Sequence, residues 1–169
     1  MNIERIASAL STDSKKTLIV AKRLSNDNYI VPRHLADATG IVDEGFGAIL
    51  KTHNYKPYEY SGAIWEDVFD LKSSASGASR EAKEAMYHLT DDTKTVLELA
   101  ELYSLMNTGN EQIQIEPIHI LLAALDFNAG GLKLDIQNPK VAIDLRIALL
   151  AAFQDRLKTE SVKSAQPAA

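Results

Sequence analysis

Two stretches of the chain match each other and decide the fold: LSTDSKKTLIVA at residues 10–21 and LTDDTKTVLELA at residues 89–100. They are separated by 79 residues, their register places Leu10 level with Leu89, and both close on an alanine. Self-similarity at a fixed spacing is the signature of a duplicated structural unit. The sequence therefore predicts two diverged copies of one repeat.

A second pair of segments matches further along each copy. YIVPRHLADA at residues 29–38 aligns with QIEPIHILLA at residues 114–123, at a spacing of 85 residues. The larger spacing implies a six-residue insertion in the second copy, around residues 106–112. A glycine and then a proline follow the histidine at similar distances in both copies, namely Gly45 with Pro57 and Gly130 with Pro139.

Each copy reads as a series of helices. Hydroxyl and carboxylate side chains at residues 11–14 and 90–93 are typical of helix N-caps. Apolar residues then recur at helical spacing. Pro32 and Pro117 suit the first turn of the next helix, where a missing backbone N–H costs nothing. That helix in the second copy, at residues 118–125, is apolar nearly all round and is predicted to be central.

Two more helices are expected in each copy. The segment Gly45-Phe46-Gly47 is predicted to be a turn and not a phosphate-binding loop, with a short helix around residues 48–50 after it. A fourth helix begins at each later proline. The last of these, at residues 139–158, has a strong apolar stripe formed by Val141, Leu145, Ala148, Leu149 and Ala152.

The organisation that follows is a single domain at residues 1–159 with a flexible tail at residues 160–169. Repeat one covers about residues 10–71 and repeat two about residues 80–158. The small, polar segment at residues 72–79 is the linker between them. The fold class is all-α, a pseudo-twofold tandem of two four-helix repeats with about eight helices.

Composition excludes several functional classes. The net charge is −5 with a pI near 5.4, and no concentrated Lys/Arg cluster is present, which argues against a nucleic-acid partner. No apolar run approaches the roughly 20 residues that cross a membrane, and the start of the chain lacks the pattern of a secretory signal. With no cysteine, the chain has no disulfide or thiolate site. We expect a cytoplasmic protein.

The duplicated pattern resembles the N-terminal domain of Clp-type AAA+ unfoldases. The resemblance is clearest in IEPIHILLAAL at residues 115–125 together with residues 90–100, and it covers about residues 10–155. It implies a pseudo-twofold bundle of about eight helices that receives substrates or adaptor proteins and carries out no catalysis. The ATPase phosphate loop, Gly-x-x-x-x-Gly-Lys-Ser/Thr, does not occur here. The chain is then either a free-standing relative or a piece cut from an unfoldase.

One departure from that family concerns ligand recognition. Many relatives have Thr-Glu-His where this chain has Pro32-Arg33-His34 and Pro117-Ile118-His119. In some relatives the glutamate helps to bind phosphorylated arginine. Because neither copy keeps the carboxylate, phosphoarginine recognition is not expected here.

No catalytic, metal or cofactor site is predicted. Glu116 and His119 have the i, i+3 spacing of helical di-iron ligands, but such sites need two such motifs and two further glutamates, and the first copy has Val31 instead of Glu116. His34 and His119 are expected to be structural, hydrogen bonding near helix starts. No nucleophile elbow, Gly-x-Ser-x-Gly, exists.

The aromatic residues that follow the first copy's short helix are the candidates for partner contact. Aromatic side chains are enriched in protein interfaces as well as in cores. The candidates are Tyr55, Tyr58, Tyr60, Trp65 and Phe69, and the tyrosines are expected near the surface. The leading hypothesis is a binding module for a Clp-type unfoldase, its adaptor or a client polypeptide. A structural accessory subunit of a protease or chaperone assembly and a helical metalloprotein remain the alternatives.

Overall fold

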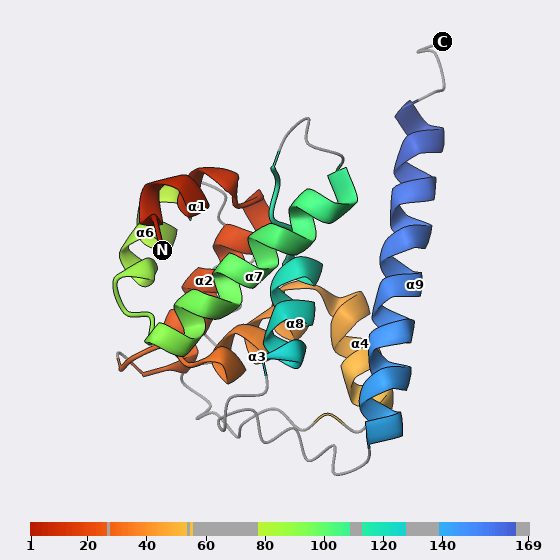
Figure 1. Ribbon diagram of the computed structural model, residues 1–169, viewed down its shortest axis with the longest axis horizontal. Coiled ribbons are helices and arrows are strands. Elements are labelled where there is room, and N and C mark those ends of the chain that lie inside the picture. The colour runs from red at the N-terminus through yellow and green to blue at the C-terminus, as the bar shows by residue number, and fades with distance from the viewer. Residues whose placement is uncertain (27, 54, 56–77, 109–112, 128–138, 165–169) are drawn as a thin grey trace.

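The computed structural model describes residues 1–26, 28–53, 55, 78–108, 113–127 and 139–164. These residues form eight α-helices and no β-strand, so the predicted all-α class is confirmed for them (Figure 1). None of the described helices is long and apolar enough to cross a membrane. The helices are α1 Ile3–Ala9, α2 Thr12–Leu24, α3 Pro32–Val42, α4 Glu44–Thr52, α6 Ala78–Met86, α7 Asp91–Thr108, α8 Pro117–Asp126 and α9 Pro139–Ser164.

The predicted starts of α2, α3, α7 and α8 are confirmed. The hydroxyl of Ser11 accepts the backbone N–H of Ser14 at 3.2 Å and caps α2, and the hydroxyl of Thr90 accepts the N–H of Thr93 at 3.3 Å before α7. Pro32 and Pro117 are the first residues of α3 and α8. Local side-chain chemistry therefore fixes where the four central helices begin.

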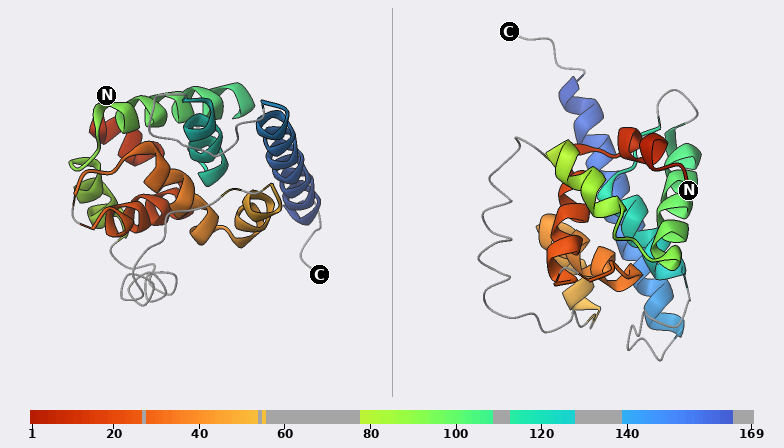
Figure 2. Two further views of the ribbon diagram at one scale, coloured as in Figure 1. Left: turned by 90° about the horizontal axis from the view of Figure 1, so that it is seen from below. Right: turned by 90° about the vertical axis from the view of Figure 1, so that its left-hand side faces the viewer.

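Helices α2, α3, α7 and α8 form the centre of the molecule. In Figures 1 and 2, α1 and α6 pack on one side of this centre, and α4 and α9 lie on the other. Residues Pro117–Ala124 of α8 are all buried, which confirms the central position predicted from its apolar sequence. One continuous apolar core joins helices from the first and second parts of the chain.

Two short backbone contacts tie the first part of the chain to the second. Leu10, before α2, forms a parallel bridge with Ile115, before α8. Ile30, before α3, forms a parallel bridge with Leu89, before α7. In both bridges one partner directly precedes the hydroxyl residue that caps a helix. The other partner lies two positions before a helix that begins with a proline.

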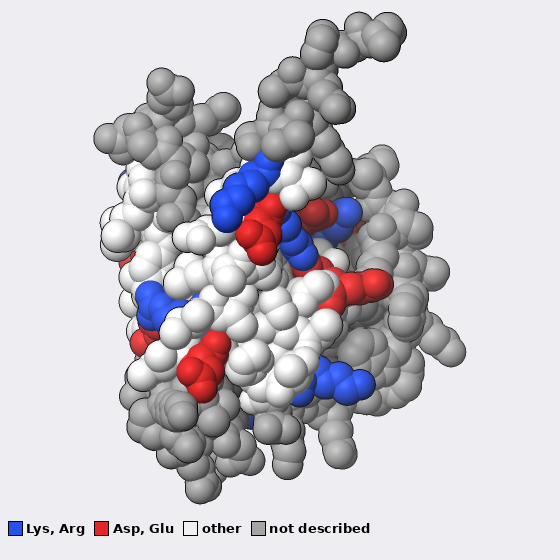
Figure 3. Space-filling view, turned by 90° about the vertical axis from the view of Figure 1, so that its right-hand side faces the viewer, with Lys and Arg blue, Asp and Glu red and all other residues white. Residues whose placement is uncertain are grey.

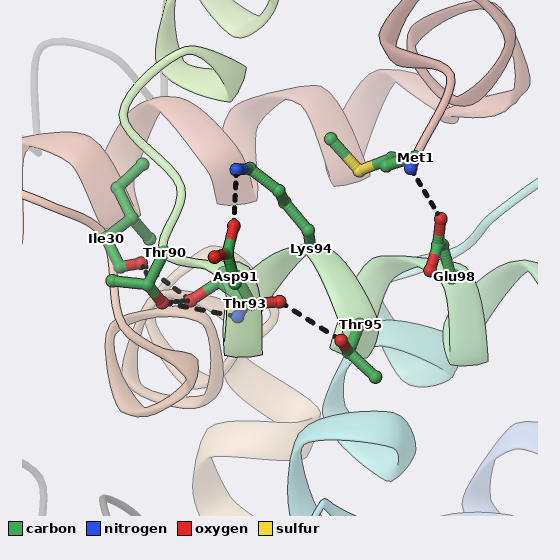
Figure 4. Close-up of polar contacts among 8 residues, drawn as sticks. All are labelled: Met1, Ile30, Thr90, Asp91, Thr93, Lys94, Thr95 and Glu98. Carbon is green, nitrogen blue, oxygen red and sulfur yellow. Dashed lines mark hydrogen bonds and ion pairs between the residues drawn. The ribbon is translucent and has the colours of Figure 1, made fainter.

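Buried hydroxyl groups complete both contacts. Ser14 donates its hydroxyl hydrogen to the Ile115 carbonyl oxygen at 2.6 Å, and Thr93 donates to the Ile30 carbonyl oxygen at the same distance. The same two carbonyl oxygens also accept backbone N–H groups, from Ser11 at 3.0 Å and from Thr90 at 3.1 Å. Figure 4 shows the contact at Ile30. These two buried carbonyl groups and two buried hydroxyl groups are thereby paired, as burial requires.

The glycines at positions 45 and 47 lie inside α4, so the predicted turn at Gly45–Gly47 is wrong. Asp43 caps this helix by accepting the Phe46 N–H at 3.1 Å, which starts the helix before the glycines. A Cβ atom on Gly47 would lie 2.3 Å from the Gly40 carbonyl oxygen. Gly47 is needed because α3 and α4 approach each other too closely there for a side chain.

Other predicted boundaries also shift. Part of the insertion expected around residues 106–112 is helical, because α7 continues to Thr108. Helix α9 runs to Ser164, six residues beyond its predicted end, so the start of the expected flexible tail is helical. Helix α6 begins at Ala78, inside the expected linker. The helix expected after Pro57 and the turn at Gly130 lie outside the described residues.

Candidate functional site

A pocket of about 340 Å³ opens where α4, α8 and α9 meet the start of α2. This volume is at the small end of the roughly 300–1,000 Å³ range of ligand pockets. The lining combines carboxylates, aromatic rings and aliphatic side chains: Asp13, Asp43, Phe46, Gln114, Glu116, Pro117, Ile118, His119, Phe153, Arg156 and Leu157. Both parts of the chain contribute to it.

The first turn of α8 forms one wall of the pocket. Pro117 starts the helix, and the Nδ1 atom of His119 accepts the backbone N–H of Glu116 at 3.0 Å. His34 makes the same contact at the start of α3, where its Nδ1 accepts the Val31 N–H at 3.3 Å. Both histidines therefore cap helices, in agreement with the structural role that the sequence predicts for them.

His119 is almost completely buried, with 1% of its surface exposed. The ring of Phe153 from α9 meets it edge-on, with the ring centroids 5.5 Å apart. Burial lowers the pKa of His119 from 6.5 to about 4, because the charged imidazolium would lose its hydration. At neutral pH His119 is therefore uncharged, and because Nδ1 accepts a hydrogen bond, its proton is on Nε2.

A charged contact closes the opposite wall. The guanidinium of Arg156, on α9, donates two hydrogen bonds to the Asp43 carboxylate, one of them from Nη2 to Oδ1 at 2.7 Å. The same guanidinium lies 4.4 Å from the ring centroid of Phe46. A Cβ atom on Gly45 would lie 2.6 Å from Arg156 Nη2. The absence of a side chain at Gly45 is what admits the guanidinium to the start of α4.

The charge of the pocket follows from these contacts. Burial alone would raise the pKa of Asp43, but hydrogen bonds from Arg156 and from the Phe46 N–H outweigh it and hold the pKa below its usual value. Asp43 is therefore ionised and already paired with Arg156. Glu116 and Asp13 add two carboxylates to the lining, the latter 3.0 Å from the Lys16 ammonium through its Oδ1 atom, and His119 is neutral. The pocket carries an excess of negative charge.

The aromatic residues proposed for partner contact do not gather at this pocket as far as they are described. Tyr55 is buried, its hydroxyl donates to Asp37 at 2.5 Å, and its ring lies 6.0 Å from the Arg33 guanidinium carbon. The surface location predicted for Tyr55 is therefore wrong. Tyr58, Tyr60, Trp65 and Phe69 lie outside the described residues.

The pocket residues that sequence reasoning missed are Asp43, Phe46, Phe153 and Arg156. Asp43 and Arg156 are 113 positions apart, and no local pattern links them. The one available signal was the pair of glycines inside an otherwise helical stretch. In the sequence a turn explains these glycines equally well, and only the close contacts of Gly45 and Gly47 distinguish a helix from it.

Among the described residues, no group of three His, Cys, Asp or Glu side chains is placed to hold a metal ion. Glu116 and His119 lie on the same wall of the pocket, but the His119 Nδ1 atom is engaged by the Glu116 backbone. The neighbouring Ile118 side chain is apolar and 1% exposed. This wall is suited to packing and hydrogen bonding.

Comparison of the chain with known protein families, with curated proteins and with solved structures finds no match. The likeness to Clp-type N-terminal domains therefore rests on the residues quoted above and stays a prediction.

Proposed function

We propose that this chain is a protein-binding domain with the two-repeat, Clp N-like architecture that its sequence pattern indicates. The support is the reciprocity of the central contacts. Leu10 and Leu89 occupy equivalent positions in the sequence alignment, as do Ile30 and Ile115. Each leucine bridges the isoleucine of the other copy, which is the arrangement that a twofold axis between two repeats would produce.

Matching details at the helix starts strengthen this proposal. The hydroxyl bonds of Ser14 and Thr93 lie at the edges of the two bridges, and the residues are equivalent in the alignment. The Nδ1 contacts of His34 and His119 are equivalent as well. Four equivalent polar contacts at four separate helix starts are difficult to explain without a common repeat.

The observation that carries the functional proposal is the pocket between the two repeats. Asp13 and Asp43 come from the first repeat, while Glu116, His119 and Phe153 come from the second. Shape and buried apolar area can hold a peptide side chain in such a groove, and the excess of carboxylates favours a basic one. We propose that the pocket receives basic, apolar segments of a client or adaptor polypeptide.

This proposal differs from the phosphoarginine recognition of some Clp relatives. Ile118 replaces the expected glutamate and is buried in the pocket wall. The negative charge comes instead from Asp13 and Glu116, which lie at the starts of α2 and α8. A basic side chain would be attracted and a phosphate group repelled.

The test is fluorescence anisotropy with two short labelled peptides of equal length, one alternating leucine with arginine and one alternating leucine with glutamate. The arginine peptide should bind, and salt should weaken the binding because exposed charges are screened. Replacing Asp13→Asn together with Glu116→Gln should weaken it by roughly tenfold. Asp91→Asn removes a 95% exposed carboxylate elsewhere and is the matched control.

Absence of binding by either peptide would exclude the proposed function. Equal binding of both peptides, or equal losses in the double variant and in the Asp91→Asn control, would show that this pocket is not the site.

A further inference from the structure

Helix α9 has a second apolar stripe, beside the face that packs on the molecule and outermost at Ile143 and Ile147. Ile143 is 58% exposed and Ile147 59%, Leu157 is 46% exposed at the edge of the pocket described above, and Leu150 is partly buried against the core. With Gln154 included, the stripe runs through positions 143, 147, 150, 154 and 157, which are alternately four and three positions apart. This is the narrow stripe of a coiled-coil seam, with one polar position in it.

The face that α9 packs against the molecule is a different one. Leu145 and Leu149 are fully buried there and belong to the stripe predicted from the sequence. From Gln154 to Thr159 every described side chain is exposed, and the tertiary contacts of this stretch are those of Arg156 with Asp43 and Phe46 and of Leu157 at the pocket. Because isolated helices of this length are marginal in water, an uncovered apolar seam along α9 indicates that another helix packs on it.

We propose that the partner is a second copy of this chain, and that two α9 helices pair in an antiparallel coiled coil. The register that aligns the two seams places Ile147 opposite Leu157 of the other copy, and Leu150 opposite Gln154. In heptad notation Ile147 and Gln154 are a positions, and Leu150 and Leu157 are d positions. Each layer of the pair therefore joins an a position to a d position, as antiparallel pairing requires. The interface is isologous and closes as a dimer.

Charge complementarity selects this arrangement. In the same register Asp144 flanks the seam opposite Lys158 of the other copy, and the twofold axis repeats this pair. Asp144 is exposed, and the Lys158 side chain is 76% exposed, with its Nζ 3.4 Å from Asp155 of its own helix. A parallel alignment would set each residue level with its own copy, leaving Asp144 and Lys158 about 21 Å apart along the axis.

The outer face of α9 is open to such a partner. Figure 3 looks onto the side of the molecule on which α9 lies, and uncharged residues fill the middle of that face, with charged residues around them. In Figures 1 and 2, α9 stands at the edge of the molecule, with the other described helices on one side of it. A second helix can therefore approach without displacing described parts of the fold.

Sedimentation velocity over a concentration series tests the proposal. The wild-type chain should form a dimer. The charge reversals Asp144→Lys and Lys158→Asp should each weaken dimerisation by roughly tenfold, because each creates two repulsive pairs per dimer. The double variant should regain it. An equimolar mixture of the two single variants should form heterodimers, since their charges again complement each other.

A second pair of variants tests the apolar seam. Ile147→Glu should abolish the dimer, whereas Leu102→Glu, which changes a 55% exposed leucine on α7, should leave it intact. Circular dichroism and thermal melting should show both variants folded, because both positions are exposed. A wild-type chain that stays monomeric at its highest soluble concentration would overturn the proposal. A dimer that Ile147→Glu leaves unchanged, or that both single charge reversals leave unchanged, would overturn it as well.

Discussion

At the scale of the residue, two histidines make one contact in two different environments. Both accept a backbone N–H at the start of a helix, yet His119 is buried against Phe153 whereas His34 is partly exposed. Burial lowers the pKa of His34 as well, although the Asp37 carboxylate opposes the shift and Arg33 adds to it. Protonating either ring therefore costs free energy in the folded state that it does not cost in the unfolded state.

The difference between the pKa of His119 in the folded and in the unfolded chain predicts that stability depends on pH. The unfolded chain takes up a proton on His119 near pH 6.5, whereas the folded chain does so only near pH 4. Between these values the unfolded state binds more protons, so the free energy of unfolding falls as the pH falls, by up to about 1.4 kcal/mol per pH unit. Urea unfolding from pH 7.5 to 4.5 should show this slope.

The control for that measurement is His119→Gln, which cannot take up a proton. Its slope over the same range should be clearly shallower than that of the wild type. An unchanged slope in His119→Gln would assign the pH dependence to other groups.

The sequence predicts residues whose role is local and misses those whose role depends on distant partners. Ser11, Thr90, Pro32 and Pro117 act on neighbouring backbone groups, so position in the sequence was sufficient to assign them. The partner of Asp43 lies 113 residues away on a different helix. Tyr55 was misplaced for the same reason, because its burial depends on Asp37 and Arg33 of α3.

At the scale of the element, α4 is shaped by what its glycines allow. Gly47 lets α3 come close, and Gly45 admits the Arg156 guanidinium from α9. The periodicity of the sequence could not separate a turn from a helix here, because glycine is unfavourable in helices and common in turns. The end of α9 was also missed, because Ser161–Ser164 carry no apolar stripe.

The contact between α4 and α9 predicts a measurable coupling. In the wild type, Gly45→Ala should destabilise the protein, because its Cβ atom displaces the Arg156 guanidinium from Asp43. In an Arg156→Ala background the same change should be neutral or stabilise the protein, by up to about 1 kcal/mol, because alanine is the better helix former. A double-mutant cycle by urea unfolding measures this reversal. Additive effects would show that Gly45 does not serve to admit Arg156.

At the scale of the whole molecule, the two bridges and the shared core make the described helices one cooperative unit. The carbonyl of Ile115 accepts two hydrogen bonds and that of Ile30 three, all from residues far away in the sequence. The core cluster includes residues of α2, α3, α7 and α8 together. Neither half of the chain contains all the partners for its own buried backbone.

Cooperativity can be tested at the two equivalent hydroxyls. Ser14→Ala and Thr93→Val should each lower the free energy of unfolding by roughly 1–2 kcal/mol, because each removes a hydrogen bond to the buried carbonyl and one with the capping hydroxyl, while the carbonyl keeps a backbone donor. Neither change should split the transition. Circular dichroism and size-exclusion chromatography should give coincident urea curves in both variants. Separate transitions for the two probes would show that the halves unfold independently.

The reciprocal bridges also affect how the chain folds while it is being synthesised on the ribosome. Ile30 leaves the ribosome well before Thr90, and Ser14 well before Ile115. At about 5–20 residues per second the delay is several seconds. Until then the first half has the apolar faces of α2 and α3 without the helices that cover them. A nascent chain of this protein therefore exposes apolar surface, of the kind that chaperones bind, until its second half has been translated.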